Sequence, residues 1–386
     1  MTHRDFATRA IDHPVRGAPA TGDVVPPIHL STAFEMDDPG APGQGYKYSR
    51  FGNPTRDTLE ATLAGLEGAD HALALSSGMA AISTVCFSTL SPGDHVVAFE
   101  SLFGGTKALF DDLLAPMDVD VSYVDATDPS NVAAAATADT ELVWAESPTN
   151  PLLRLCDIEA IAAIADEYDA RFAVDNTFNT PYVQRPLELG ADVVVYSTTK
   201  FLNGHSDATG GAVVTDHETW MEHARFVGAK AFGAVMAPFD CYLVQRGLKT
   251  LPLRMDQHQA NAQAVAEFLA DHSEIEHVYY PGLESHPQHD LANEQMDGYG
   301  GVVSFEVAGD AAVAKAFLEE LDVFNLAVSL GGVESLVEHT ASMSAGNLSA
   351  EEREWAGISE SLVRAPIGVE DVDDLLDDLA TALEKL

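Results

Sequence analysis

The chain has 386 residues, of which 46% are hydrophobic and 8% aromatic, and it carries 61 Asp and Glu against 20 Lys and Arg, a formal net charge of −41. This length predicts two or three domains, and the hydrophobic content excludes an acidic disordered chain. The lack of a basic surface argues against a nucleic-acid partner, and the lack of any apolar run of about 18 residues argues against a membrane span.

The first 55 residues contain many glycines and prolines and show little periodicity, so we expect an arm rather than a packed element. Tyr46, Tyr48, Arg50 and Phe51 form an aromatic and basic cluster that is unusual for a flexible tail. The cluster favours an arm that docks on another surface.

A helix follows the arm, and strands and helices then alternate. Asn53 and Pro54 offer a turn and an N-cap, and the helix after them carries Leu59, Leu63 and Leu66 on one face. The predicted strands are residues 71–75, 95–99, 120–124, 141–145, 172–174, 192–196 and 210–214. The predicted helices between them are one that ends at residue 89 and those over 105–114 and 157–168. This alternation predicts βαβ units and a parallel sheet.

The pattern changes beyond about residue 246. A long helix is predicted over 255–269, a strand over 302–307 and an amphipathic surface helix over 372–379. We therefore expect a smaller C-terminal α/β domain. The predicted division of the chain is an arm over 1–55, a large domain over 56–246 and the small domain over 247–386.

Lys200 is the first candidate for chemistry. It comes just after the apolar strand 192–196, close to the hydroxyls of Ser197 and Thr199 and ahead of a glycine-rich strand. A lysine past a strand is usually solvated and inert. Here its amine could form a Schiff base with an aldehyde cofactor while the two hydroxyls bind the cofactor phosphate.

Asp175 argues against an inert role for Lys200. It ends the predicted strand that precedes the Lys200 strand, and ligands of parallel sheets bind beyond the carboxyl ends of the strands. Asp175 and Lys200 could thus face one cofactor. Pyridoxal 5'-phosphate (PLP) needs this pair, a lysine for the imine and a carboxylate that keeps the pyridine nitrogen protonated.

Several motifs occur in the order that characterises one family. The chain resembles the Cys/Met-metabolism family of PLP enzymes, which includes cystathionine γ-synthase, cystathionine γ-lyase, the homoserine-ester sulfhydrylases and methionine γ-lyase. The matching segments, besides that of Lys200, are residues 48–56, 76–82, 146–151, 175–178, 329–335 and 362–364. The resemblance implies PLP fold type I, which is aspartate-aminotransferase-like, with a large, mainly parallel seven-stranded sheet and a smaller C-terminal α/β domain.

The resemblance also implies roles for individual residues. Backbone N–H groups of Gly78 and Met79 at a helix start would bind the cofactor phosphate. The substrate α-carboxylate would be bound by Arg364, with Asn150 and Ser329. The cofactor-binding set implied by the family comprises Tyr48, Arg50, Gly78, Met79, Phe103, Asp175, Thr177, Ser197, Thr199 and Lys200.

In this family Tyr48 and Arg50 reach the phosphate of the adjacent subunit. The arm would therefore contact a neighbouring copy of the chain, and the expected assembly is a dimer that shares its active sites, with a homotetramer built from two such dimers. The other expected partners are small amino-acid substrates.

The chain departs from the family pattern at Phe103, where many members carry a tyrosine stacked on the cofactor ring, and at Lys47, Phe51 and Ala345. We expect cystathionine γ-synthase or γ-lyase chemistry, meaning γ-replacement or γ-elimination on homoserine esters or cystathionine. An O-acetyl- or O-succinylhomoserine sulfhydrylase is the alternative, and Phe103 favours it. An inactive binding or scaffold protein with this fold is a third possibility, which the intact Lys200 opposes.

The remaining features concern location and metals. Residues 1–7 lack the apolar core of a secretory signal, and the three cysteines have no disulfide or metal spacing, so we expect a cytoplasmic location. His286 and His289 lack partners at ligand spacing, and we expect no metal site. The charge favours a halophile, since molar salt screens acidic self-repulsion. The alternative to the halophile interpretation is an acidic surface that binds a basic partner.

Overall fold

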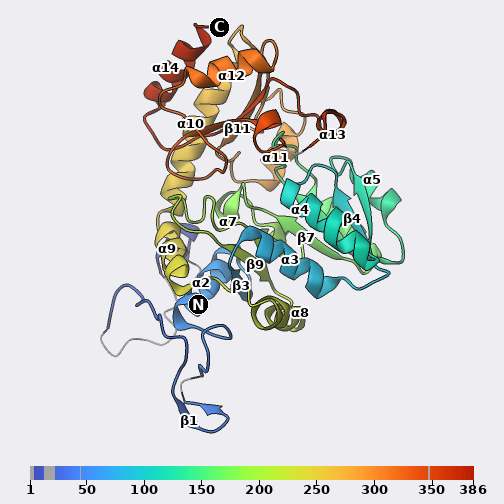
Figure 1. Ribbon diagram of the computed structural model, residues 1–386, viewed down its shortest axis with the longest axis vertical. Coiled ribbons are helices and arrows are strands. Elements are labelled where there is room, and N and C mark those ends of the chain that lie inside the picture. Colours follow the sequence, from blue (N-terminus) through green and yellow to red (C-terminus); the bar gives the residue numbers. More distant parts are fainter. Residues whose placement is uncertain (1–3, 13–21, 44, 347) are drawn as a thin grey trace.

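The computed structural model describes residues 4–12, 22–43, 45–346 and 348–386. It contains a seven-stranded sheet and a five-stranded sheet (Figure 1). The N-terminal stretch projects away from the main body, with the two-stranded pair of β1 (Met36–Asp38) and β2 (Ala41–Pro42) at its far end. Residues 1–3, 13–21 and 44 of the predicted arm lie outside the described residues.

The larger sheet has the order β3-β9-β8-β7-β6-β4-β5. Its strands are β3 (His71–Leu75), β4 (His95–Phe99), β5 (Asp120–Val124), β6 (Thr140–Glu146), β7 (Arg171–Asp175), β8 (Val193–Tyr196) and β9 (Gly211–Thr215). Neighbours from β5 to β8 pair in parallel, whereas β9 pairs antiparallel with both β8 and β3. The expected mainly parallel seven-stranded sheet is confirmed. Because helices cover both of its faces, central strands such as β8 are buried at every residue.

The smaller sheet has the order β10-β11-β14-β13-β12. Its strands are β10 (Ile275–Tyr279), β11 (Val302–Val307), β12 (Asn325–Leu326), β13 (Leu336–His339) and β14 (Leu362–Pro366). Its pairs are antiparallel except the parallel pair of β12 and β13. The structure thus confirms a second α/β layer in the C-terminal part of the chain.

The helices that precede the second sheet are α1 (Phe6–Ile11), α2 (Pro54–Glu67), α3 (Gly78–Thr89), α4 (Gly104–Ala108), α5 (Pro129–Ala135), α6 (Ile158–Glu167), α7 (Thr180–Val183), α8 (Glu218–Arg225) and α9 (Pro238–Leu248). Those in the C-terminal part are α10 (Leu251–Ala270), α11 (His289–Gln295), α12 (Ala311–Glu319), α13 (Ala350–Trp355) and α14 (Val372–Leu383). Short π-helical turns continue α4 over Leu109–Leu114 and α8 over Phe226–Ala231. None of the described helices is long and apolar enough to cross a bilayer.

The start of α2 follows from its local sequence. The Asn53 side chain accepts a hydrogen bond from Thr55 N at 3.0 Å, and Pro54 occupies the first helical position, where a missing N–H costs nothing. Gly68 ends the helix with φ +84°, a conformation that favours glycine. The predicted N-cap and the apolar face with Leu59, Leu63 and Leu66 are therefore confirmed.

Two features of the structure were not expected. The helix predicted over 105–114 is α4 followed by a π-helical turn. Helix α1 lies in the stretch expected to be an arm, and the Arg9 guanidinium donates to Gly65 O of α2 at 2.6 Å. The first part of the arm therefore packs on its own chain. The predicted boundaries at 55/56 and 246/247 fall within α2 and α9, and the division into domains stays a prediction.

Candidate active site

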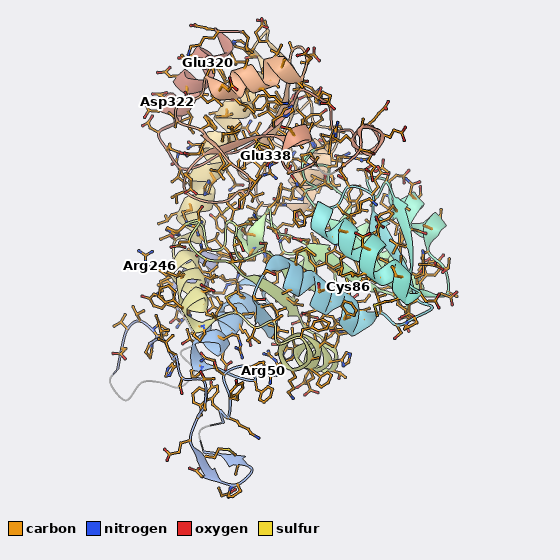
Figure 2. All side chains as sticks on the ribbon, in the orientation of Figure 1. Arg50, Cys86, Arg246, Glu320, Asp322 and Glu338 are labelled. Carbon is orange, nitrogen blue, oxygen red and sulfur yellow. The ribbon has the colours of Figure 1, made fainter. Side chains whose placement is uncertain are left out.

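A cavity of about 440 Å³ lies between the two sheets, where β6, β7 and β8 end and α3 begins. It receives side chains from the larger sheet and, across from them, Glu338 of β13 and Arg364 of β14. Figure 2 shows Glu338 near the smaller sheet, above the helices that cover the larger one. The predicted residues that line the cavity are Gly78, Met79, Phe103, Asn150, Asp175, Thr177, Ser197, Thr199, Lys200, Ser329 and Arg364.

The Lys200 amine points across the cavity. Its Nζ donates a hydrogen bond to Ser329 Oγ at 2.7 Å. The pKa of Lys200 is lowered from 10.5 to about 8, mainly by burial and also by the nearby Arg364, while Glu338 opposes both effects. A lysine in this setting carries a larger share of neutral, nucleophilic amine near neutral pH than a free lysine does, and the rest of it is protonated there.

Two carboxylates lie side by side at the ends of neighbouring strands. Asp175 of β7 pairs in register with Glu146 of β6, and both line the cavity. Asp175 Oδ1 accepts hydrogen bonds from Thr177 N at 3.0 Å and Thr177 Oγ1 at 2.5 Å. Burial raises the pKa of both carboxyls, and Asp175 raises that of Glu146 further. A cationic nitrogen facing Asp175 would stabilise the ionised carboxylate against this effect of burial. The pyridinium of PLP is such a nitrogen.

The N-terminus of α3 forms one end of the cavity. Ser77 caps the helix by accepting from Ala80 N at 3.0 Å, and the first N–H groups of a helix have no acceptor within it. A Cβ on Gly78 would lie 2.9 Å from Ser197 Cβ, and one on Gly211 would lie 2.1 Å from Ser77 O. Only glycines allow this close approach, which brings the helix start against the segment that holds Lys200.

Two hydroxyls lie beside this helix start. Ser197 Oγ makes no hydrogen bond within the described part of the chain, while Thr199 Oγ1 accepts from Gly210 N at 2.9 Å and donates to Gly210 O at 3.2 Å. A phosphate would therefore gain the Ser197 donor directly and the Thr199 donor in exchange for a backbone acceptor. Helix dipole, free N–H groups and hydroxyls together fit a phosphate monoester.

A buried ion pair forms the opposite wall. The Arg364 guanidinium donates from Nη1 to Asn150 Oδ1 at 2.7 Å and from Nη2 to Ser329 O at 3.0 Å, and Nη2 lies 3.2 Å from Glu338 Oε1. Ser344 Oγ also donates to Glu338 Oε1, at 2.6 Å. Arg364 Nε and Glu338 Oε2 are buried and without a hydrogen bond among the described residues. An arginine with an unused donor beside an open cavity suits a substrate carboxylate.

Ser329 has a strained backbone, with φ +92°. This region disfavours residues other than glycine, and such strain gathers at functional sites. The strain places the Ser329 hydroxyl against Lys200 and its carbonyl against Arg364. One residue thus holds both cations of the cavity in place.

Tyr48 and Arg50 are the two predicted residues that do not line this cavity. Arg50 Nη1 donates to Lys230 O at 3.0 Å, and its guanidinium lies 4.5 Å from the centre of the Phe51 ring and 5.7 Å from that of Tyr48. Figure 2 shows Arg50 beside the olive helical segment that includes α8, away from Glu338. In a single chain, therefore, the arm cluster and the cavity are separate.

Phe103 stands at the cavity wall and is 47% exposed. Its backbone N–H donates to both carboxylate oxygens of Glu146, at 2.9 and 2.8 Å. Glu146 thus anchors the segment that carries the ring.

Sequence reasoning missed Glu146 and Glu338 as site residues. The rule that found Asp175, a carboxylate at the end of a parallel strand, also applies to Glu146, which ends the next strand of the sheet. No comparable signal marks Glu338, because it belongs to a different sheet that only folding brings to the cavity.

Comparisons with known proteins fit this site. The sequence profile of the Cys/Met metabolism PLP-dependent enzyme family matches residues 7–384. The chain belongs to this family. It is therefore a PLP-dependent enzyme, as the motifs predicted, and the donor set of the cavity fits that cofactor.

The chain is similar over nearly its whole length to several relatives. It is 48% identical to cystathionine γ-synthase of Mycobacterium tuberculosis over 377 residues, which are 98% of this chain and 96% of the relative. It is 46% identical to cystathionine γ-lyase of Dictyostelium discoideum, covering 95% and 94% of the two chains. It is 45% identical to cystathionine β-lyase of Coxiella burnetii, covering 97% of each chain.

A solved structure shows the same fold. The crystal structure of metB from Corynebacterium glutamicum superposes with a TM-score of 0.95 at 42% sequence identity, covering 99% of this chain and 98% of that one. The expected fold class, PLP fold type I with two α/β parts, is confirmed.

The lowered pKa of Lys200 predicts how cofactor-free protein takes up PLP. The neutral amine is the reactive form, so its reaction with the aldehyde should speed up as pH rises through about 8, where half of the Lys200 side chains have lost their proton. A free lysine analogue should show the same rise only near pH ~10.4. The rate is followed by absorbance after mixing apoprotein with PLP. A midpoint near that of the free analogue would show that the site does not activate Lys200.

Proposed function

We propose that this enzyme catalyses transsulfuration of the cystathionine γ-synthase or γ-lyase type, and that γ-replacement on an activated homoserine ester is its main reaction. The observation that carries the proposal is the Lys200 amine beside the buried Arg364, with Asp175 at the end of the neighbouring strand. These three groups are what PLP chemistry on an α-amino acid requires. Relatives named as cystathionine enzymes support the substrate class.

The cofactor would be held at three points. Lys200 would bind its aldehyde carbon, Asp175 would face its pyridine nitrogen, and Thr177 would keep Asp175 in place by its two hydrogen bonds. The phosphate would lie at the start of α3, and the groups proposed to bind it are the N–H groups of Gly78 and Met79 and the hydroxyls of Ser197 and Thr199. When bound, PLP withdraws electrons from the substrate carbons that lose a proton or a leaving group.

The substrate would be oriented by its α-carboxylate. Arg364 has an unused Nε donor, and its other nitrogens are fixed by Asn150, Ser329 and Glu338. Because these contacts already fix the guanidinium, binding of the substrate would not cost the additional entropy of ordering the arginine. The scaffold alternative does not account for such an array of buried, mutually oriented cations.

Lys200 is also the proposed acid–base group. With a pKa of about 8 its amine can take a proton from the substrate Cα and return one at the neighbouring carbon within the physiological pH range. Water exclusion comes from the apolar wall formed by Met79, Ile82 and Leu330. Protons would then move between lysine and substrate with little exchange into solvent.

A sulfhydrylase that uses O-acetyl- or O-succinylhomoserine with sulfide is the second candidate, and Phe103 favours it. Purified protein in high salt is offered O-acetylhomoserine, O-succinylhomoserine or cystathionine, each with and without cysteine or sulfide. Fastest turnover of an ester with cysteine supports the synthase. Faster turnover with sulfide supports the sulfhydrylase, and no turnover of any substrate by yellow, PLP-loaded protein would support the scaffold.

We further propose that the arm completes the site of a neighbouring subunit, through contact of Tyr48 and Arg50 with its phosphate. The separation of these residues from their own cavity supports this assignment. The smallest active unit would be a dimer, and a tetramer would be two such dimers.

Subunit mixing tests this assignment. Arg50→Ala and Lys200→Ala proteins, each nearly inactive alone, are mixed under conditions that exchange subunits. Each mixed dimer then holds one site with both an intact Lys200 and an intact neighbouring arm. Random exchange of equal amounts makes about half of the dimers mixed, so activity should return to about a quarter of wild type. Failure to recover activity despite demonstrated exchange would place the arm in its own subunit's site.

The acidic surface supports the proposal that the protein works in a salt-rich cytoplasm. On α14, for example, Asp373, Asp374 and Asp377 are exposed, while Asp378 is buried and accepts backbone N–H groups of residues 322–324. The exposed carboxylates repel one another, and only the buried one is compensated by donors.

We therefore predict a steep gain in stability with salt. The midpoint of thermal unfolding and the activity should both rise as KCl goes from about 0.1 M to above 1 M, because the Debye length falls from about 10 Å to about 3 Å. Sucrose at matched water activity serves as the control for solvent exclusion, which stabilises without screening. A midpoint that stays level or falls with KCl would refute the halophile interpretation.

A further inference from the structure

Arg56 is the most deeply buried arginine near the arm, with 1% of its surface exposed. It sits in the first turn of α2, but its guanidinium reaches back to the arm. Nη1 donates to Ser49 O at 3.0 Å, and Nη2 donates to Arg50 O at 3.3 Å. The fork of one arginine thus fixes the backbone at the residue whose side chain is proposed to reach the neighbouring phosphate.

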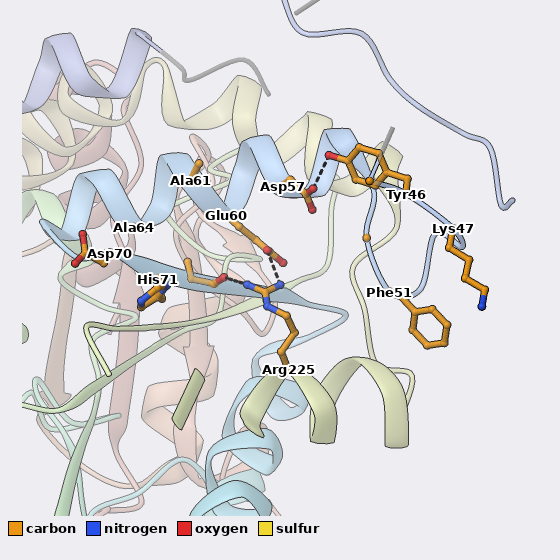
Figure 3. A pocket seen from close by; sticks show the side chains of 13 residues that line it. Tyr46, Lys47, Phe51, Asp57, Glu60, Ala61, Ala64, Asp70, His71 and Arg225 are labelled. Atoms are coloured by element: carbon orange, nitrogen blue, oxygen red, sulfur yellow. Dashed lines mark hydrogen bonds and ion pairs between the residues drawn. The ribbon is translucent and has the colours of Figure 1, made fainter. Parts of the chain in front are cut away.

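Glu60, one helical turn further along α2, connects this arginine to β3. Its Oε1 lies 3.6 Å from Arg56 Nε and accepts the N–H of Ala74 at 3.0 Å. Its Oε2 accepts from Arg225 Nη1 at 2.8 Å, and Arg225 Nη2 donates to Ala72 O at 2.8 Å. Figure 3 shows Arg225 reaching from α8 towards Glu60 on α2, with Lys47 and Phe51 of the arm to one side of a cavity of about 420 Å³.

The same network leads to the turn before α3, where the phosphate of the chain's own cofactor is proposed to lie. β3 is an edge strand of the larger sheet, and Ala74 is separated from the capping residue Ser77 by only two residues. Ser76 N in turn donates to Ala234 O at 2.9 Å, in the segment whose Lys230 O accepts from Arg50. The arm, α2, β3 and the segment after α8 therefore form a closed set of contacts.

The two buried charges in this network depend on each other. Arg56 and Glu60 are both buried, and loss of one member of a buried pair leaves the other without compensation. Hydrogen bonds to charged groups contribute more than neutral ones, and here one guanidinium fixes the carbonyls of two consecutive residues of the arm.

We propose that Arg56 and Glu60 are positioning residues that hold the arm ready for the phosphate of the neighbouring subunit. The inference rests on the proposed role of the arm. Neither residue lines the cofactor cavity, so they act through the arm backbone and not on the cofactor itself. Arg56→Met should raise the dissociation constant of PLP at the neighbouring site by about 10- to 100-fold, the value of one or two charge-assisted hydrogen bonds.

Two kinds of mixed dimer show whether Arg56 affects PLP binding in the neighbouring subunit or in its own. In the first, Arg56→Met and Lys200→Ala are on one chain and the other chain is wild type, so the intact lysine meets the altered arm. In the second, the two substitutions are on opposite chains, so the intact lysine meets an unaltered arm. PLP binding at the lysine-bearing site is measured as pyridoxyl label fixed by borohydride during PLP titration.

Weak PLP binding in the first arrangement and wild-type binding in the second is the expected result. The reverse pattern, or equal binding in both, would overturn the proposal. Arg50→Ala is carried through the same two arrangements. If Arg50→Ala shows no difference between them, the proposed role of the arm fails, and if only Arg56→Met shows none, the positioning role fails.

Trypsin gives a readout that needs no cofactor. Cleavage after Arg50 in the apoprotein should be faster in Arg56→Met and Glu60→Gln than in wild type, and unchanged in Arg246→Met, which removes an exposed arginine of α9 (Figure 2). Arg56→Lys keeps the charge beside Glu60 but cannot fork to two carbonyls, and it replaces the methionine variant if that variant does not fold. Equal cleavage rates in all variants would refute the proposal.

Discussion

Replacement of Lys200 by alanine should lower kcat by about 10⁴-fold, the upper end of what one positioned acid–base group contributes. The loss should be this large because Lys200 is proposed both to hold the cofactor and to move the substrate proton. No other lysine lines the cavity among the described residues. Steady-state turnover of an activated homoserine ester, in molar salt with saturating PLP, measures the effect.

The matched control is Lys315→Ala, which removes an exposed lysine of α12 and should leave kcat unchanged. Borohydride treatment of the wild type should leave a pyridoxyl group on the peptide that contains Lys200. Label on any other lysine would refute the assignment, whatever the activity of the variants.

Replacement of Phe103 by tyrosine should change which reaction the enzyme performs. Departure of a thiolate from cystathionine needs protonation, whereas an ester carboxylate leaves with little help. A phenol at the cavity wall can act as that general acid, and such assistance is typically worth about 10²–10⁴ in rate. The wild type should therefore consume homoserine esters faster than it cleaves cystathionine, and Phe103→Tyr should raise the cystathionine rate selectively.

Comparison of kcat/KM for the two substrates in both proteins measures this change. Phe103→Leu serves as the control, because it changes the ring without adding a hydroxyl and should not raise cystathionine cleavage. A wild type that cleaves cystathionine faster than it uses either ester would show that the phenol is dispensable here, and the lyase name would then be the better one.

Much of the larger sheet could be predicted because its strands have a strong local signal. Val193 to Tyr196 is a short run of β-formers that is buried on both faces, and turn residues bound it. Asp175 and Lys200 could be linked from sequence because both follow such strands. Parallel topology puts the ends of neighbouring strands at one edge of the sheet.

Other parts could not be predicted, for physical reasons. Helix α1 is only six residues long and buries only Ala10, so it is too short for an apolar periodicity to be detected. The π-helical turn after α4 belongs to a rare class that the helical periodicity of about 3.6 residues does not distinguish. Glu338 meets Arg364 through the register of β13 and β14, a long-range pairing that no local pattern encodes. The substrate-binding role of Arg364 came from family resemblance alone.

The position of the arm cluster outside its own cavity has a consequence for how activity depends on the amount of protein. If each cavity is completed by a second chain, an isolated chain is an incomplete catalyst, and dilution below the dimer dissociation constant should lower the specific activity by mass action. In a cell that makes an arm-defective copy beside a normal one, the defective chains would also disable normal cavities. A mutation in the arm would then be dominant, although loss of function in one copy of an enzyme is usually recessive.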